Sequence, residues 1–108
     1  MRTLKIRFAA IGAAALLLSS IVPVETAAAK SGCSKRVVMY DASWCPYCRQ
    51  VRGILARNNI KYTIRDATTA PVQAEMVKRF GSTAVPRTVI GGVVVSGVDE
   101  ARIKQLCR

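Results

Sequence analysis

The sequence contains no histidine and only one Cys-x-x-C pair, formed by Cys45 and Cys48. Structural zinc sites in proteins usually combine four cysteine and histidine ligands at short spacings. The two remaining cysteines, Cys33 and Cys107, lie far from this pair, near the two ends of the chain that follows residue 30. The sequence therefore argues against a zinc site.

Acidic side chains are also scarce, with six Asp and Glu against 17 Lys and Arg and a net charge of +11. From residue 30 onward the chain has 14 basic and five acidic residues, which gives about +9. Such a charge attracts anionic partners over a long range, although a soluble surface explains it equally well. Aromatic residues make up only 6% and do not alternate with the scattered basic residues, so no nucleic-acid partner is expected.

The sequence lacks an apolar run long enough to span a membrane. The uncharged run Phe8–Val22 has 15 residues, whereas a bilayer span needs about 20. Basic residues at positions 2, 5 and 7 precede it, and Pro23 and small residues up to Ala29 follow it. This pattern is typical of a signal peptide cleaved after Ala28 or Ala29. We expect residues 1–29 to be this signal and residues 30–108 to be one periplasmic or secreted domain, attached to a membrane only if the signal stays uncleaved.

Hydrophobic spacing after residue 30 predicts seven elements in the order β-α-β-α-β-β-α. The expected strands are Val37–Tyr40, Lys61–Arg65, Arg87–Ile90 and Val93–Val95, and the expected helices are Pro46–Asn58, Ala70–Phe80 and a last helix after Asp99. The strand-helix-strand start implies a parallel pair, and Gly91-Gly92 implies an antiparallel hairpin. The sequence therefore predicts an α/β fold with a mixed four-stranded sheet and helices on both faces.

Apolar spacing supports the second strand and the second helix. Alternation in 61–65 places Tyr62 and Ile64 on one face of the second strand. The second helix carries its apolar residues at Val72, Met76, Val77 and Phe80.

Cys45 and Cys48 have the spacing and context of a redox pair. They follow a strand and begin a helix, so the unpaired N–H groups and the positive end of the helix dipole are directed at Cys45. Arg49 and Arg52 add positive charge. We expect Cys45 to be mainly thiolate at neutral pH, while Cys48 keeps its proton on the apolar face of the helix. Cys45 would attack a disulfide, and Cys48 would then resolve the mixed disulfide.

Two further segments bear on substrate binding. Val85-Pro86 directly precedes a strand, and a proline there is well placed to have a cis peptide bond. Such a loop opposite the dithiol would offer the Val85 N–H and C=O groups to an extended peptide. Ser96–Asp99 begins the last helix, where N–H groups could bind a carboxylate or serve only as a helix cap.

Together these motifs resemble the dithiol glutaredoxins. Cys45-Pro46-Tyr47-Cys48 resembles the active-site tetrapeptide of that family. Gly81–Pro86 is similar to the segment that ends in Thr-Val-Pro, with Ala84 in place of the threonine, and Gly91–Asp99 is similar to the hairpin and the Gly-Gly-x-Asp turn. The resemblance extends from Arg36 to Leu106 and implies a thioredoxin-like (glutaredoxin) fold and thiol-disulfide oxidoreductase activity.

The resemblance also implies a glutathione site. Tyr47 would border the groove and Val85 would pair with the tripeptide backbone next to Pro86. The residues implied to hold the two ends of the tripeptide are Gln73, Val98 and Asp99. Ala42 stands where the family often has a lysine, so Arg87 or Lys35 would have to replace its charge. Trp44 is nearer to the thioredoxin pattern and would offer an apolar contact to a protein substrate.

Cys33 and Cys107 could pair in an oxidising compartment and join the two ends of the domain. Free thiols, an intermolecular bridge, or a Cys33 that lies in a flexible tail are the alternatives.

The predicted function is therefore an exported oxidoreductase, with protein disulfides, glutathione or both as partners. We expect a monomer that binds no cofactor and uses glutathione as co-substrate. Two other interpretations stay open: an iron–sulfur module held through Cys45 with glutathione, and a soft-metal carrier that uses Cys45 and Cys48.

Overall fold

The structure, a computed structural model, describes residues 31–108, and the expected signal peptide, residues 1–29, lies outside the described residues. The elements in chain order are β2 (Val37–Asp41), α3 (Pro46–Arg57), β3 (Thr63–Asp66), α4 (Ala70–Phe80), β4 (Arg87–Ile90), β5 (Val93–Ser96) and α5 (Glu100–Leu106). This is the order that the hydrophobic spacing predicts.

The four strands form one mixed sheet in the order β3-β2-β4-β5. Strand β2 pairs with β3 in parallel, because helix α3 carries the chain back across the sheet between them. Strand β4 is antiparallel to both of its neighbours. Gly91 and Gly92 make the tight β4–β5 turn at φ values of 54° and 88°, which side chains with a Cβ rarely adopt. The predicted mixed sheet is confirmed.

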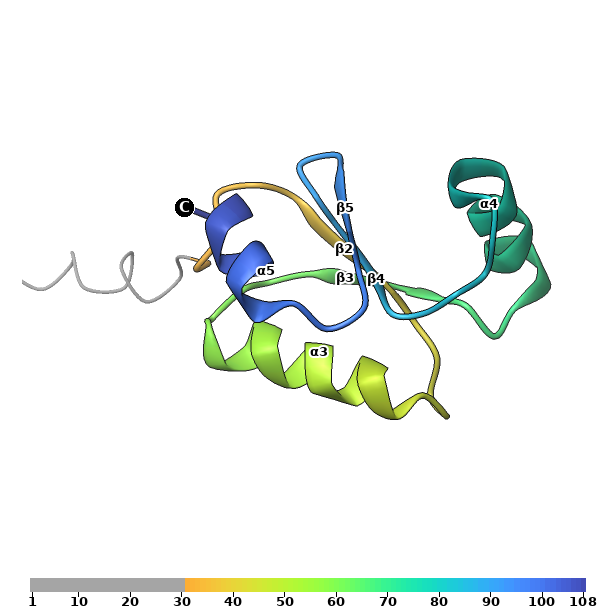
Figure 1. Cartoon of the computed structure of the whole chain (residues 1–108), viewed down its shortest axis with the longest axis horizontal. Coiled ribbons are helices and arrows are strands. Elements are labelled where there is room, and N and C mark those ends of the chain that lie inside the picture. The colour runs from red at the N-terminus through yellow and green to blue at the C-terminus, as the bar shows by residue number, and fades with distance from the viewer. Residues whose placement is uncertain (1–30) are drawn as a thin grey trace, which may run out of the picture. The chain divides into compact units, whose positions relative to one another are not determined.

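Helices cover both faces of this sheet, as Figure 1 shows. Neighbouring residues of a strand point to opposite faces, so Met39 and Tyr40 enter different clusters. The cluster around Met39 contains apolar side chains of α3 and α5, including Leu55 and Ile103. The cluster around Tyr40 contains apolar side chains of α4, including Met76. The helix that begins at the dithiol is thus packed on one side of the sheet.

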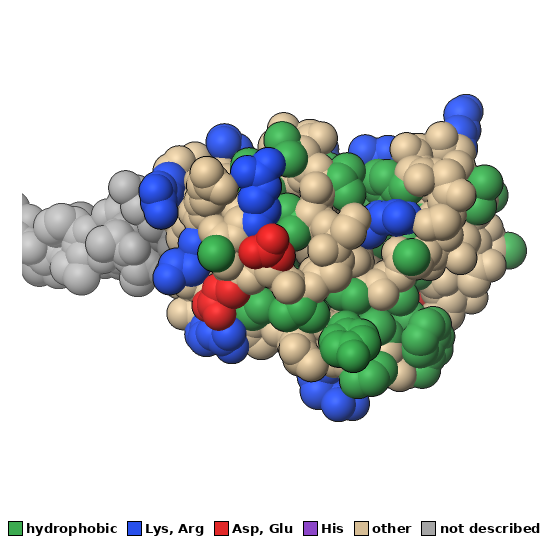
Figure 2. Space-filling view, viewed as in Figure 1, with side chains coloured by type: hydrophobic (Ala, Val, Ile, Leu, Met, Phe, Trp, Pro, Cys, Tyr) green, Lys and Arg blue, Asp and Glu red, His purple; other side chains and the backbone are tan. Residues whose placement is uncertain are grey.

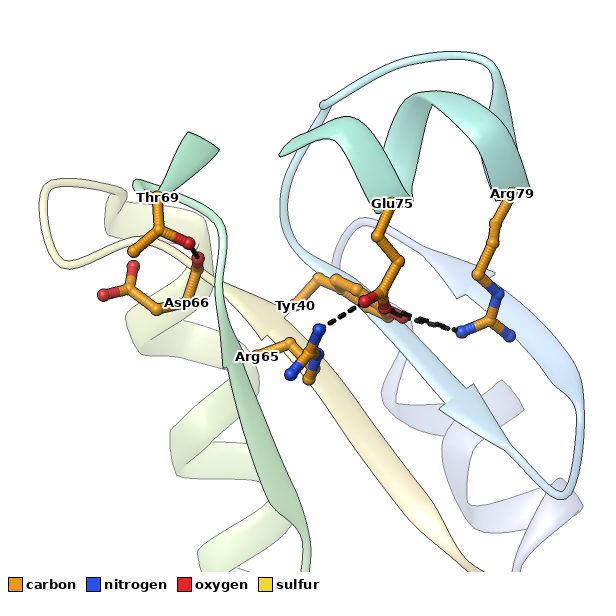
Figure 3. Close-up of polar contacts among 6 residues, drawn as sticks. All are labelled: Tyr40, Arg65, Asp66, Thr69, Glu75 and Arg79. Atoms are coloured by element: carbon orange, nitrogen blue, oxygen red, sulfur yellow. Dashed lines mark hydrogen bonds and ion pairs between the residues drawn. The ribbon is translucent and has the colours of Figure 1, made fainter. Parts of the chain in front are cut away.

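A polar network joins α4 to the other face of the sheet (Figure 3). The buried Tyr40 hydroxyl donates to the Glu75 carboxylate and accepts from Arg79 at 2.7 Å. Arg65 of β3 forms an ion pair with the same carboxylate. Burial and the neighbouring Glu75 raise the pKa of Tyr40. The network therefore connects β2, β3 and α4 through one carboxylate.

Two apolar side chains of these elements are exposed. Strand β3 is exposed along its whole length, and the Ile64 side chain is 47% exposed, because β3 is the edge strand of the sheet. Val77 is 55% exposed on α4, whereas Val72 and Met76 are buried. Tyr62, just before β3, packs against the core.

A disulfide joins the two ends of the described chain. The Cys33 and Cys107 sulfurs are 2.11 Å apart and both side chains are buried. Figure 1 accordingly shows the start of the described chain beside the C-terminus, at the end of α3 remote from the dithiol. Within residues 31–108, no helix is long and apolar enough to cross a membrane.

Candidate active site

Cys45 is the N-cap residue of α3. Its backbone is extended and Pro46 follows as the first helical residue, a position where the missing N–H group costs nothing. The Cys45 N–H group donates to the Ala42 carbonyl at 3.1 Å, which closes the turn after β2. The Cys45 sulfur accepts the Cys48 N–H group at 3.1 Å. The helix therefore directs one of its unpaired donors at this sulfur.

Cys48 lies one turn into α3 and has no exposed surface. Burial, then the thiol contact with Cys45, raises the pKa of Cys48 to about 12. Cys45 itself is only 3% exposed, and both cysteines are free thiols in the structure. Both side chains belong to one apolar cluster. The pair is asymmetric because Cys45 is the N-cap and accepts a helix N–H group, while Cys48 lies one turn into the helix and has a raised pKa.

The arginines of α3 differ in what they contribute to this site. Arg52 is not a free cation, because its guanidinium lies 2.5 Å from the Asp41 carboxylate at the end of β2. Only 9% of Asp41 is exposed, and its negative charge is among the causes that raise the pKa of Cys48. Arg49 is exposed. The expectation that both arginines add net positive charge is therefore wrong for Arg52.

The Val85–Pro86 peptide bond is cis. Val85 packs against both hydrophobic clusters, one of which contains Cys45 and Cys48. The Pro86 carbonyl accepts the Gly97 N–H group at 3.0 Å, which fixes this loop to the turn before α5. The loop and the start of α3 enclose a groove of about 300 Å³, lined by Tyr47, Gln50, Val85, Pro86, Gly97 and Val98. We call it the dithiol groove because Tyr47, which lies between Cys45 and Cys48 in the sequence, is in its lining; the two cysteines themselves are not.

The dithiol groove brings together four of the residues that the resemblance implied, namely Tyr47, Val85, Pro86 and Val98. Gln73 and Asp99 are not in its lining. The Gln73 amide donates to the Ala67 carbonyl at 2.9 Å, and the Asp99 carboxylate caps α5 by accepting the Arg102 N–H group at 3.0 Å.

Sequence reasoning missed two lining residues, Gln50 and Gly97. Helical spacing could have found Gln50, which lies three residues after Tyr47 and hence on the same face of α3. Gly97 belongs to the Ser96–Asp99 turn and could have been included with it.

Large apolar side chains surround the dithiol on the surface. Trp44 is 71% exposed and Tyr47 is 60% exposed, on either side of Cys45. Figure 2 shows hydrophobic side chains gathered at the lower right, over the start of α3. Among the described residues, no group of three or more His, Cys, Asp or Glu side chains is placed to hold a metal ion.

Comparisons with known proteins agree with this geometry. A family model described as "Glutaredoxin" matches residues 37–95. A glutaredoxin of Pseudomonas aeruginosa is 35% identical over 65 residues, which cover 59% of this chain and 77% of that protein. Glutaredoxin 3 of Escherichia coli K12 is 29% identical over 65 residues, covering 59% and 78%. The crystal structure of a glutaredoxin from Archaeoglobus fulgidus superposes with a TM-score of 0.60 at 27% identity, covering 69% of this chain and 88% of that one.

Proposed function

The chain belongs to the glutaredoxin family and is a glutaredoxin-like thiol-disulfide oxidoreductase, and from this premise we propose that it is an exported dithiol enzyme. In this proposal Cys45 and Cys48 exchange disulfides with proteins, glutathione or both. The single observation that carries it is the asymmetric pair, in which the Cys45 sulfur at the helix N-cap accepts the Cys48 N–H group, while the Cys48 thiol lies one turn further into α3 with a raised pKa.

The reaction has two displacement steps. The Cys45 thiolate attacks one sulfur of a substrate disulfide, forms a mixed disulfide and releases the other sulfur as a thiolate. Cys48 then gives its proton, directly or through water, to the thiolate released in the first step and attacks the Cys45 sulfur, which forms the Cys45–Cys48 disulfide and releases the second substrate thiolate. The substrate gains two electrons and the enzyme loses two. The same steps in reverse oxidise a substrate dithiol.

Burial of the resolving thiol fits the order of these steps. The raised pKa of Cys48 keeps it protonated while Cys45 attacks, so Cys48 does not compete for the substrate. After the mixed disulfide forms, Cys48 lies one helical turn from its target, which gives the second step a high effective concentration.

Glutathione is the proposed small-molecule co-substrate, with no bound cofactor. Its backbone would pair with Val85 beside Tyr47 in the dithiol groove, and its γ-glutamyl end would lie near Val98 and Asp99. One oxygen of the Asp99 carboxylate caps α5, and the other would be the one that meets an ammonium group. Gln73, which holds the Ala67 carbonyl, would have to exchange that hydrogen bond for one to the tripeptide.

Export is supported by the signal-like segment at residues 1–29 and by the Cys33–Cys107 disulfide, a bond that persists in oxidising compartments. We therefore propose a periplasmic or secreted monomer, residues 30–108. We do not favour a soft-metal carrier, because it would leave the Val85–Pro86 loop and its groove without a role. We do not favour an iron–sulfur module either, because the family members that hold such a cluster more readily have a single active-site cysteine, and this chain has Cys48 as well.

The full-length gene, expressed in a bacterium with an export pathway, tests the proposal. The protein should appear outside the cytoplasm with a mass that corresponds to cleavage after Ala28 or Ala29. Cys45→Ser should abolish turnover, whereas Cys48→Ser should keep exchange with glutathione mixed disulfides and lose the reduction of protein disulfides. Turnover by the Cys45→Ser variant would overturn the proposed mechanism.

The direction of electron flow follows from the equilibrium potential of the exported protein in a glutathione buffer. A value near that of thioredoxin, about −270 mV, would favour reduction of substrates. A value near that of the periplasmic oxidant DsbA, about −120 mV, would favour disulfide formation.

A further inference from the structure

The dithiol groove has no charged side chain in its lining. Its walls are the apolar side chains of Val85, Pro86 and Val98, the glycine at 97, and the neutral polar side chains of Tyr47 and Gln50. Glutathione, in contrast, carries two carboxylates and one ammonium group at neutral pH. A groove that selects such a tripeptide pairs charged side chains with its ends. Asp99, outside the lining, could meet the ammonium group, but no cation in the lining pairs with either carboxylate.

The nearby arginines do not supply a cation to the groove. Arg87 donates to the Ser82 carbonyl at 2.9 Å and stacks over the Phe80 ring at 4.9 Å. Arg52 is paired with Asp41. Arg49 is two positions after Tyr47, about 200° around the helix, so it projects away from the groove. The charge missing at Ala42 is therefore not replaced by these arginines.

Lys35 is no closer to the site. It precedes β2, and its aliphatic chain lies against Gly91 in the β4–β5 turn. The dithiol follows the opposite end of β2, which is five residues long, or about 17 Å. Neither of the two residues that could stand in for the family lysine thus reaches the groove.

The groove does offer what an extended polypeptide needs. Val85 lies just before β4, and its N–H and C=O groups have no hydrogen-bond partner among the described residues. A peptide strand could pair with both groups. Its alternate side chains would then lie on Val98, which is 42% exposed, and on the rings of Tyr47 and Trp44.

Resting on the proposed function, we propose that the dithiol groove selects disulfides in extended protein segments whose residues beside the cysteine are apolar and uncharged, in preference to glutathione mixed disulfides. The occupant is thus a protein chain with an apolar sequence around its cysteine. The positive charge of the rest of the domain raises encounter rates with anions in general but supplies no fixed partner within this groove.

The test uses the exported Cys48→Ser protein, in which only the attack by Cys45 takes place. Three probes carry the same leaving group, 2-nitro-5-thiobenzoate, in a disulfide with cysteine. The cysteine belongs to glutathione, to a capped pentapeptide with valines on both sides of it, or to the matching pentapeptide with glutamates. Stopped-flow absorbance of the released thiolate gives three second-order rate constants.

The proposal predicts that the valine probe reacts at least about tenfold faster than the glutathione probe, with the glutamate probe also slow. An equal or faster reaction of the glutathione probe would overturn the inference and leave the proposed enzyme intact. If none of the three probes reacts, the proposed function itself fails.

Two lysine variants locate the effect. Val98→Lys places a cation in the groove and should raise the rate constant of the glutathione probe about twofold to fivefold, which is the effect of an exposed ion pair. The ratio of the valine-probe rate to the glutathione-probe rate should fall accordingly. Val77→Lys is the matched control, because Val77 is also an exposed valine but lies on α4 outside the groove lining. An equal change in both variants would show an effect of net charge and would overturn the assignment to the groove.

Discussion

Replacing both Cys33 and Cys107 by alanine should remove much of the free energy of unfolding of the domain. The disulfide joins residues separated by 74 positions, so it restricts nearly the whole unfolded chain. In the chain-entropy model, a loop of that length corresponds to about 4.5 kcal/mol at 25 °C. A domain of the size of Ser31–Arg108 has a total unfolding free energy of roughly 4–12 kcal/mol. The disulfide therefore accounts for a large share of the total.

Urea unfolding at 25 °C, followed by circular dichroism, measures this loss. The double-alanine variant should lose about 3–5 kcal/mol, and its melting temperature should fall by more than about 12 °C. Its unfolding should also expose more surface, because the unfolded chain is no longer cross-linked. The free energy of unfolding should therefore fall more steeply with urea concentration.

The matched control is Cys45→Ser with Cys48→Ser, which also removes two buried cysteines but no cross-link in the reduced enzyme. In this control, the dependence of the unfolding free energy on urea concentration should be the same as in the unmodified protein. A loss below about 1 kcal/mol in the Cys33 and Cys107 variant would refute the stabilising role of the disulfide.

Three further predictions concern charged and polar contacts. Asp41→Asn should bring the pKa of Cys48 below about 12, because it removes a nearby negative charge, while burial keeps this pKa above its normal value. The rate of Cys48 alkylation, measured against pH, gives the pKa, and an unchanged pKa would contradict the prediction. The pKa of Glu100 is held at about 2, below its ordinary 4.5, so its contribution to stability is present above pH 4.5 and is lost as the pH falls toward 2. Glu100 forms an ion pair with Arg57, with 2.5 Å between the carboxylate oxygen and the guanidinium nitrogen. Glu100→Gln should therefore make the urea midpoint depend less on pH between these values, and an unaltered acid dependence would argue against this ion pair. Tyr40→Phe should cost about 1–3 kcal/mol in urea unfolding, because it leaves the buried partners of the hydroxyl unpaired, and a neutral result would show that water replaces it.

Local patterns in the sequence were sufficient for the order of elements. The apolar run before the dithiol, Pro46 at a helix start and the Gly91-Gly92 turn each depend on neighbouring residues only, and each is found in the structure. The exposure of Ile64 could not be predicted in this way. It depends on β3 being an edge strand, which is a property of the strand order in the whole sheet.

The site was harder to predict where side chains have two possible partners. The Asp41–Arg52 pair joins a strand end to a helix across the dithiol turn, and nothing in the local pattern indicates it. Asp99 and Gln73 each bind backbone groups close in the sequence, so their roles as helix cap and loop tie compete with ligand binding. Gln50 was missed because its neutral side chain gives no chemical signal, only a position on the helix.

The central claim is that Cys45 attacks and Cys48 resolves. Peptide mapping by mass spectrometry tests it directly, after the exported Cys45→Ser and Cys48→Ser variants have each been mixed with a disulfide-linked peptide. The Cys48→Ser variant should carry one peptide, bound to Cys45, and the Cys45→Ser variant should carry almost none. A peptide bound to Cys48 at a comparable rate would contradict the account.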